Sequence, residues 1–377
     1  MRDEIVIVFD KIPTKKDGGL VATYVDFVNE LADIFDITFL SIFRSDPSDI
    51  PAFLQVKTVT LLDSELDNRF YKLFTHLRGG DVKGFLFALS SAFRYFLSIP
   101  GARSRTAKLL SGKKVIAVAP AAAAFLSRKI AYILEIHTSY EYFWGQNILG
   151  RAQSMLIAPP RLTVFRNEAD ARKGAARFPS TFMYNTFDDS ALPRPSLPSR
   201  SRFRACFVGR LVEQKNPLLL LDYANEVRQS VSEFELDIYG DGPLFDKLSD
   251  EIHARGLGNC VTLKGFTDDK SVYRNYDLLW LSSRIEGFGL VIIEAAANMV
   301  PTVSADWGPA VYEVIQNGAT GFVAKSSKDF IDKSILLLSD IELRNQFAAA
   351  AYEDFHNRFS VGVHRSRLIE LIEKVYS

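Results

Sequence analysis

Cysteine is scarce in this sequence, which contains only Cys206 and Cys260 among its 377 residues. Two cysteines cannot build a disulfide framework or a cysteine-ligated zinc site, and this favours a reducing compartment. Long hydrophobic runs are also lacking at the N-terminus, where the segment MRDEIVIVFD holds five successive apolar residues. Five are too few for the core of a signal peptide or for a membrane span. We therefore expect a cytoplasmic protein.

Net charge is absent as well, because 45 basic side chains balance 45 acidic ones, but the two halves of the chain differ. Residues 1–200 carry 26 Lys or Arg against 20 Asp or Glu, and residues 201–377 carry 19 against 25. The basic surplus is concentrated in residues 69–200, where 20 basic residues face 7 acidic ones. Such an excess attracts anions, whether phosphorylated substrates, acidic lipid headgroups or nucleic acid.

Short apolar runs alternate with amphipathic helical patterns along the chain, which predicts an α/β fold. The run at 5–9 is continuously apolar and rich in β-branched residues, as in a strand buried on both faces of a parallel sheet. A glycine-containing loop and an amphipathic helix at 20–35 follow it, which is the beginning of a Rossmann-like unit. Further strands are predicted at 37–43, 113–119, 131–136, 205–208, 235–239, 261–264, 278–281 and 302–304, and further helices at 218–229 and 244–254.

The length of the chain exceeds that of a typical single domain, and the sequence suggests where it divides. Residues 190–202, SALPRPSLPSRSR, contain three prolines and four serines and are predicted to form a linker. We therefore predict one Rossmann-like domain at 1–189 and a second at 203–360. A C-terminal helix at 361–377 would then be free to pack back on the first domain.

One segment departs from the alternation of strands and helices. Residues 69–114 combine ten Lys or Arg with a single acid, Asp81, and with many phenylalanines. Helices of this composition can lie in a membrane interface, with aromatic side chains in the lipid and cations at the headgroups. Alternatively, the aromatic side chains pack in the domain core while the cations form a solvated face. The sequence leaves both interpretations open.

The most informative motif is EGFGLVIIEA at 286–295, which follows a predicted strand. The strand leads through a glycine-bearing loop into a helix, so the backbone N–H groups of Gly289 and Leu290 lie at a helix N-terminus and can bind a phosphate. Glu286 lies in the loop and Glu294 about one turn inside the helix, so the two carboxylates can address different parts of one ligand. In a purely structural role, Glu286 would cap the helix and Glu294 would be a buried acid.

This motif resembles the Glu-x7-Glu signature of the family four ("group 1") retaining, nucleotide-sugar-dependent glycosyltransferases of the GT-B fold. FVGRLVEQKNP at 207–217 resembles the family's Gly-Arg-Leu-x-x-x-Lys-Asn segment. IYGDGP at 238–243 and VTLKGF at 261–266 follow at familiar intervals. The resemblance extends from about residue 203 to about residue 325.

The first half of the chain resembles the family only at Gly18 and Gly19, at His137, and at residues 185–188, NTFD. The resemblance implies that Gly18 and Gly19 allow close approach of the donor diphosphate or the acceptor, and that His137 contacts the donor sugar. Taken alone, a Gly-Gly pair is more often a turn. A histidine after a strand is likewise more often a satisfied core residue.

The resemblance also implies which side chains carry the chemistry. Arg210 and Lys215 would neutralise the donor diphosphate, Glu286 would hold the sugar, and Glu294 would bind the ribose hydroxyls. The catalytic residues expected on this basis are His137, Arg210, Lys215 and Glu286. The donor-binding residues expected are Gly18, Gly19, Gly209, Arg210, Lys215, Gly289, Leu290 and Glu294.

For the whole chain, the resemblance implies two Rossmann-like domains that face each other across a cleft. The expected reaction is retaining transfer of a hexose from a nucleotide diphosphate donor, with a UDP-sugar preferred, to a glycan acceptor. The sequence contains no Asp-x-Asp pair that would bind Mg²⁺ or Mn²⁺. Because Arg210, Lys215 and the helix N-terminus can stabilise the leaving diphosphate, we expect a metal-independent enzyme without a cofactor.

The resemblance, together with the basic first half, implies a lipid-linked glycan acceptor and a role in bacterial surface polysaccharide assembly. The basic charge favours peripheral attachment to the inner face of the cytoplasmic membrane. Two alternatives are a nucleotide-sugar epimerase of the same fold and a catalytically silent binding protein. A silent protein would have no need for Arg210, Lys215, Glu286 and Glu294 together. Nucleic acid is not an expected partner, because no reader motif accompanies the basic segment.

Overall fold

The computed structural model describes residues 2–14, 19–46, 48, 50–64, 81–141, 155–193, 195–197 and 203–377. The chain divides into two compact units. Unit 1 comprises Met1–Met183 and Arg365–Ser377, and unit 2 comprises Tyr184–His364. The division after Met183 falls ahead of the predicted linker, part of which lies outside the described residues.

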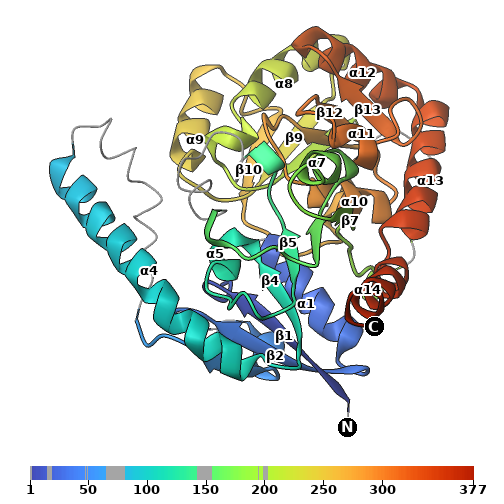
Figure 1. Cartoon of the computed structure of the whole chain (residues 1–377). Coiled ribbons are helices and arrows are strands. Elements are labelled where there is room, and N and C mark those ends of the chain that lie inside the picture. The colour runs from blue at the N-terminus through green and yellow to red at the C-terminus, as the bar shows by residue number, and fades with distance from the viewer. Residues whose placement is uncertain are drawn as a thin grey trace. The chain divides into compact units, whose positions relative to one another are not determined.

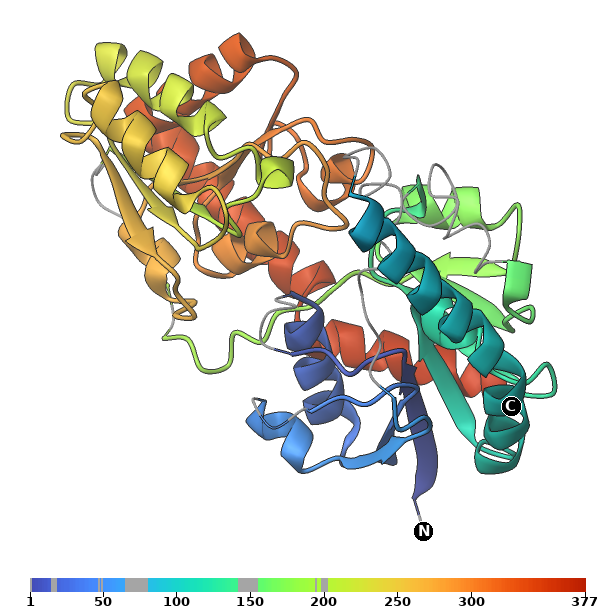
Figure 2. The same cartoon turned by 90° about the vertical axis from the view of Figure 1, so that its left-hand side faces the viewer.

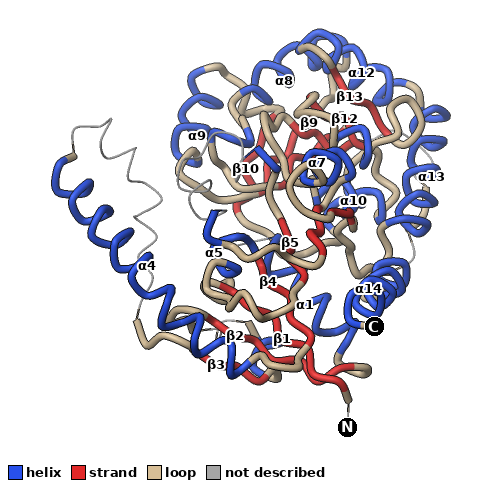
Figure 3. Tube along the Cα trace, in the orientation of Figure 1, coloured by secondary structure: helices blue, strands red, loops and turns tan. Residues whose placement is uncertain are grey.

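Unit 1 is built on a parallel sheet of seven described strands in the order β3-β2-β1-β4-β5-β6-β7 (Figures 1 and 3). The apolar run at the start of the chain forms β1, of which Ile5 to Phe9 are buried. This burial is typical of a strand that helices cover on both faces. The strands are β1 (Asp3–Phe9), β2 (Phe35–Ser41), β3 (Lys57–Thr60), β4 (Lys114–Val118), β5 (Ile133–Ile136), β6 (Leu162–Phe165) and β7 (Ser180–Phe182).

The described helices of unit 1 cover this sheet and include the C-terminal helix. They are α1 (Gly19–Leu31), α2 (Pro51–Leu54), α4 (Val82–Leu109), α5 (Ala119–Ala123), α7 (Glu168–Gly174) and α14 (Val361–Tyr376), which begins in unit 2. Leu368 and Ile372 of α14 join the apolar cluster of Tyr24 and Phe27. The Tyr376 hydroxyl donates to the Val115 carbonyl oxygen at 2.5 Å, so the end of the chain is held against β4.

Unit 2 is built on a parallel sheet of six described strands in the order β10-β9-β8-β11-β12-β13. Its core centres on Trp280, which is fully buried and lies 5.1 Å from Phe234 and 5.5 Å from Phe330 between ring centroids. Aromatic clusters of this kind contribute a large share of buried apolar area. The strands are β8 (Arg204–Val208), β9 (Glu235–Tyr239), β10 (Val261–Gly265), β11 (Leu278–Leu281), β12 (Thr302–Ala305) and β13 (Gly321–Ala324).

The helices of unit 2 connect these parallel strands, as Figure 2 shows from a second direction. The α-helices are α8 (Leu219–Ser230), α9 (Phe245–Ala254), α10 (Leu290–Ala297), α11 (Val311–Val314), α12 (Ser327–Ser339) and α13 (Ile341–Arg358). Two short 3₁₀ helices are η4 (Glu213–Lys215) and η5 (Val272–Asn275). The predicted α/β class with two Rossmann-like sheets is confirmed.

Candidate active site

The predicted donor residues of unit 2 lie near the carboxyl ends of its central strands, β8 and β11. β8 and β11 are parallel neighbours at the centre, and the strand order continues through β9 on one side and β12 on the other. The carboxyl ends of two such strands form a topological switch point, where open parallel sheets bind ligands. Gly209 and Arg210 follow β8 there, and the loop that carries Glu286 follows β11.

Lys215 and Glu286 form an ion pair at this edge. Lys215 Nζ lies 2.5 Å from Glu286 Oε1, and the Ser283 hydroxyl donates to the same oxygen at 2.5 Å. The lysine side chain is 17% exposed and the carboxylate 7%, so solvent screens the pair only weakly. The structure thus joins two residues for which the sequence implied separate contacts, the diphosphate and the sugar.

The backbone of η4 is tied to the loop after β11, and this fixes the position of Lys215. The Ser282 hydroxyl contacts the carbonyl oxygens of Lys215 and Asn216 at 3.0 and 3.1 Å. Gln214 Nε2 donates to the Ile285 carbonyl oxygen at 2.8 Å. Because these contacts cross from one loop to the other, the ion pair is held in place before any ligand arrives.

Arg210 is the exposed cation of the site. Gly209 follows β8 and donates its N–H to the Tyr239 carbonyl oxygen at 3.1 Å, and Arg210 comes next. Within the described part of the chain, the Arg210 guanidinium makes no hydrogen bond or ion pair. Its five N–H donors are therefore available to an anionic ligand at the switch point.

Gly289 is the N-cap of α10 and has a conformation that favours glycine. Its φ is +86°, and a Cβ atom placed there would lie 2.8 Å from Cδ1 of Ile292. The Ile292 N–H donates to the Gly289 carbonyl oxygen at 2.9 Å, so the N–H groups of Leu290 and Val291 precede the first backbone hydrogen bond of α10. Together with the positive end of the helix dipole, these two N–H groups could bind a phosphate, the role that the sequence predicts for Gly289 and Leu290.

Gly289→Ala is expected to lower the affinity for a nucleotide diphosphate at least about 10-fold, because the added methyl group must displace Ile292 or shift the start of α10. The matched control is Gly318→Ala, where φ is +84° and a Cβ would meet nothing within 4 Å. Both variants carry the cost of placing an alanine at a positive φ, about 1–2 kcal/mol. Isothermal titration with UDP separates them, and equal affinity in the two variants would remove Gly289 from the site.

Glu294 lies inside α10 and is 6% exposed. Its Oε1 accepts from Lys270 Nζ at 2.7 Å, and its Oε2 accepts from the Tyr273 hydroxyl at 2.6 Å. Burial raises the pKa of Tyr273 well above its usual value, and the adjacent Glu294 charge adds to that shift. Each carboxylate oxygen has two lone pairs, so each keeps one acceptor position for a ribose hydroxyl.

Glu294→Gln is expected to weaken UDP binding by about 10-fold or more, because a neutral amide loses a charge-assisted hydrogen bond to ribose. Tyr273→Phe is the matched control, since it removes one hydrogen bond to Glu294 and leaves the carboxylate and Lys270 in place. Glu286→Gln should leave the affinity for free UDP near that of the unaltered protein. Calorimetric titration measures the UDP affinity of all three variants. Equal losses of UDP affinity in Glu286→Gln and Glu294→Gln would contradict the assignment of Glu286 to the sugar and of Glu294 to the ribose.

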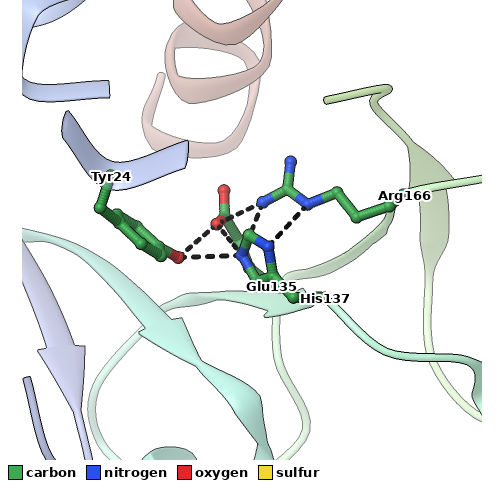
Figure 4. Close-up of polar contacts among 4 residues, drawn as sticks. All are labelled: Tyr24, Glu135, His137 and Arg166. Carbon is green, nitrogen blue, oxygen red and sulfur yellow. Dashed lines mark hydrogen bonds and ion pairs between the residues drawn. The ribbon is translucent and has the colours of Figure 1, made fainter. Parts of the chain in front are cut away.

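The predicted histidine of unit 1 belongs to a buried polar cluster, drawn in Figure 4. Tyr24 comes from α1 and Glu135 from β5, while His137 lies just after β5 and Arg166 just after β6. Glu135 Oε2 accepts from the Tyr24 hydroxyl and from Arg166 Nη2, both at 2.7 Å. His137 Nε2 lies 3.1 Å from the same oxygen.

Charge in this cluster is compensated within the protein. Burial by itself would raise the pKa of Glu135, but the Arg166 guanidinium and the hydrogen bonds from His137 and Tyr24 hold that pKa well below its usual value. Burial raises the pKa of Tyr24, and the Glu135 charge raises it further. Glu135 is therefore an ionised carboxylate paired with Arg166, and both side chains are 2% exposed.

His137 lies where the sequence predicts it, at the carboxyl end of a parallel strand, but both of its ring nitrogens contact protein groups. Arg166 Nε donates to Nδ1 at 3.3 Å, and Nε2 lies 3.1 Å from the Tyr24 hydroxyl as well as from Glu135. The imidazole is 13% exposed. Of the predicted glycine pair, Gly19 is the first residue of α1, and Gly18 lies outside the described residues.

Sequence reasoning did not identify Tyr24, Glu135, Arg166 or Lys270 as members of these sites. A signal was present for Glu135, which interrupts an otherwise apolar strand pattern, AYILEI, and a charge there must be paired when buried. Tyr24 and Arg166 had no such signal, because they are 111 and 31 residues away from Glu135. Among the residues that the structure describes, no group of three or more His, Cys, Asp or Glu is placed to hold a metal ion.

A cavity of about 710 Å³ lies away from these groups. It is lined by residues around the amino ends of β8 and β9 and the end of α8, including Arg204, Arg228, Glu235 and Cys260. Parallel sheets bind their ligands at the opposite, carboxyl ends of the strands. We therefore place the candidate site at the switch point and not in this cavity.

Comparison with known proteins relates part of unit 2 to a protein family. Residues 190–354 match the family model of the glycosyl transferases group 1. The chain is 29% identical over 177 residues to a poly(glycerol-phosphate) alpha-glucosyltransferase of Bacillus subtilis (strain 168), which covers 46% of this chain and 26% of that protein. It is 28% identical over 158 residues to a poly(ribitol-phosphate) alpha-N-acetylglucosaminyltransferase of Staphylococcus aureus (strain COL), which covers 41% and 32%.

The chain thus matches about a quarter to a third of the length of these two relatives. Among solved structures, Anabaena HepE in complex with UDP and glucose aligns over 99% of this chain and 100% of its own, with a TM-score of 0.73 and 17% identity. A Staphylococcus aureus TarM mutant in complex with UDP aligns over 99% and 100%, with a TM-score of 0.71 and 15% identity. These likenesses show the fold.

The predicted resemblance is confirmed: residues 190–354 match the model of the glycosyl transferases group 1, and the chain has the GT-B fold. The matched region contains Arg210, Lys215, Glu286, Gly289 and Glu294.

Proposed function

We propose that the protein is a retaining glycosyltransferase that transfers a hexose from a UDP-sugar to a glycan acceptor. The observation that carries this proposal is the set of groups at the ends of β8 and β11. An exposed arginine, a lysine-glutamate pair and a helix N-terminus suit a sugar diphosphate. HepE and TarM are described with UDP bound, which supports a uridine nucleotide as the donor.

In the proposed reaction, negative charge develops on the diphosphate as the bond to the sugar breaks. Arg210 and the N–H groups at the start of α10 stabilise that charge. Lys215 has three N–H donors, of which the contact with Glu286 uses one, so two remain for phosphate oxygens. Fixed cations and dipoles can supply this stabilisation without a metal or a cofactor, and we propose a metal-independent reaction.

Retention follows when the acceptor hydroxyl attacks the face from which the diphosphate leaves. The sugar loses its bond to the diphosphate oxygen and gains one to the acceptor oxygen, and the acceptor proton passes to the departing diphosphate. We propose no covalent intermediate with the protein. Glu286, held by Lys215 and Ser283, would hydrogen-bond a hydroxyl of the sugar and orient it for this attack.

The acceptor that we propose is a lipid-linked glycan or glycopolymer of the bacterial surface, met on the cytoplasmic side of the membrane. The names of two relatives specify poly(glycerol-phosphate) and poly(ribitol-phosphate), which are anionic polymers. The basic surplus of residues 69–200 suits such an acceptor electrostatically.

A thermal-shift comparison of UDP, UDP-glucose, UDP-N-acetylglucosamine and GDP-mannose tests the donor. Binding to the native state raises stability by about 2.7 kcal/mol when the ligand is at 100 times its dissociation constant. We expect uridine nucleotides to raise the melting temperature and a UDP-sugar to be hydrolysed slowly without acceptor. The absence of any shift would favour a silent binding protein, and sugar isomerisation without transfer would favour an epimerase.

A further inference from the structure

Helix α4 presents an apolar stripe to solvent. Val82, Leu86, Leu89, Phe93 and Leu97 are 67, 57, 47, 65 and 63% exposed. Their spacing of three or four residues places them on a single face of the helix. Figures 1 and 2 show the N-terminal turns of α4 extending beyond the strands of unit 1. No described strand lies against this part of the helix.

The opposite face of α4 is part of the core of unit 1. Ala92, Tyr95, Ile99 and Ala102 belong to its apolar cluster. The Tyr95 hydroxyl donates to the Ala121 carbonyl oxygen at 3.0 Å. By length and composition alone, α4 could cross a membrane. Because one face is packed and hydrogen-bonded inside the domain, the helix can lie on a membrane but cannot span it.

The charges on α4 are all of one sign. Its 28 residues include five Lys or Arg and no Asp or Glu. Lys83, Arg94 and Lys108 are exposed, and at about 100° per residue they lie on one flank of the stripe. Arg103 and Arg105 serve the fold instead, because they donate to the carbonyl oxygens of Ala124 and Leu61 at 3.1 and 2.9 Å.

We propose that this face of α4, defined by the five stripe residues and the three flanking cations, docks peripherally on an anionic phospholipid surface. An exposed apolar face flanked by cations is the pattern of a helix that lies in the membrane interface, with apolar side chains among the acyl chains and cations at the headgroups. The exposed apolar area favours a membrane as the partner of this face. A soluble polyanion would require only the cations. This inference goes beyond the proposed function, since docking requires neither donor nor acceptor.

Vesicle flotation tests the proposal with the full chain. We expect the unaltered protein to float with vesicles that contain phosphatidylglycerol, to float less at high salt, and to stay in solution with phosphatidylcholine alone. Leu89→Gln/Phe93→Gln should reduce the partition coefficient between vesicles and solution at least about 10-fold, because two apolar side chains that would be buried in the lipid are replaced by polar ones. Lys83→Gln/Arg94→Gln/Lys108→Gln should abolish the salt dependence.

Two matched controls separate the stripe from general surface properties. Leu54→Gln/Met155→Gln changes two apolar residues of unit 1 that are 64 and 77% exposed, and Lys129→Gln/Lys247→Gln/Lys374→Gln removes three exposed cations elsewhere. Both controls should float like the unaltered protein, and all variants should retain its melting temperature and UDP affinity.

Other outcomes would overturn the proposal. Solubility with anionic vesicles at low salt would do so, as would equal losses in stripe and control variants. A dimer in analytical ultracentrifugation that Leu89→Gln/Phe93→Gln dissociates, without vesicle binding, would assign the stripe to a second copy of the chain. Resistance to both high salt and alkaline carbonate would indicate an inserted helix. If the unaltered protein does not bind UDP, this result contradicts the proposed function but not the membrane docking.

Discussion

Arg210→Ala is expected to lower the turnover of a UDP-sugar about 10²-fold or more, and Lys215→Ala should do the same. Both side chains lie at the switch point of the unit 2 sheet, where charge would develop on the leaving diphosphate. Arg210 makes no hydrogen bond or ion pair with the described residues, so its removal leaves no protein group unpaired. Its effect should therefore appear in kcat and not in stability.

The two variants should differ in one respect. Lys215→Ala leaves the Glu286 carboxylate, which is 7% exposed, without its cation, so it should also lower the melting temperature. Lys247→Ala, which removes an exposed lysine of α9, is the control and should retain full activity. Initial rates with and without EDTA complete the test. Full activity in both site variants would contradict the assignment of Arg210 and Lys215 to the leaving diphosphate. A strict requirement for added Mn²⁺ would contradict the proposal of a metal-independent reaction.

Five of the six described strands of unit 2 could be predicted, because they are short, mostly apolar runs bounded by glycine or polar residues. The predictions for β9 and β11 coincide with the observed bounds, Glu235–Tyr239 and Leu278–Leu281. Four observed strands escaped prediction: β3, β6 (Leu162–Phe165) and β7 in unit 1, and β13 (Gly321–Ala324) in unit 2. β6 and β13 are short runs of four residues. β3 (Lys57–Thr60) is an edge strand without a buried residue, and β7 (Ser180–Phe182) has only three residues. Neither presents the apolar run that marks a buried strand.

Helix α4 shows why composition alone left two interpretations open. The sequence allowed residues 69–114 to be either a core element or an interfacial segment. The structure assigns one face of α4 to the core, through residues such as Tyr95, and leaves the stripe at the other face exposed. Residues 69–80 lie outside the described part of the chain. The core interpretation therefore holds for one face of α4, and the interfacial interpretation is our proposal for the other face. Residue counts cannot make this distinction between faces.

The members of the candidate site could be predicted where they follow a local pattern. Gly289 and Glu294 belong to a strand-loop-helix motif, and the helix begins where the motif places it. The partners that restrain them come from distant segments. Lys270 reaches Glu294 from the loop after β10, and Lys215 reaches Glu286 across 71 residues. Only the strand order brings such loops together, so their pairing could not be read from spacing along the chain.

Arg166→Met is expected to lower the free energy of unfolding of unit 1 by about 3–5 kcal/mol, the cost of leaving a buried charge without its partner. Glu135 would remain with hydrogen bonds from Tyr24 and His137 but without the guanidinium that lies 2.7 Å from its Oε2. The double variant Glu135→Gln/Arg166→Met removes both charges, so it should be less destabilised than Arg166→Met alone. Native-state hydrogen exchange of the β5 and β6 amides measures all three proteins.

The pair Arg172–Glu168 on the neighbouring helix α7 supplies the control, since its side chains are 76 and 43% exposed. Arg172→Met should cost less than about 1 kcal/mol. The pH dependence has a defined sign. Because the folded-state pKa of Glu135 lies below the usual 4.5, the pair contributes fully above pH 4.5 and its contribution is lost as the pH falls further. In Arg166→Met that depression is removed, so the difference between the variant and the unaltered protein should shrink on acidification. Equal costs at positions 166 and 172, or a difference that grows as the pH falls, would show that the cluster around His137 is not organised by a buried ion pair.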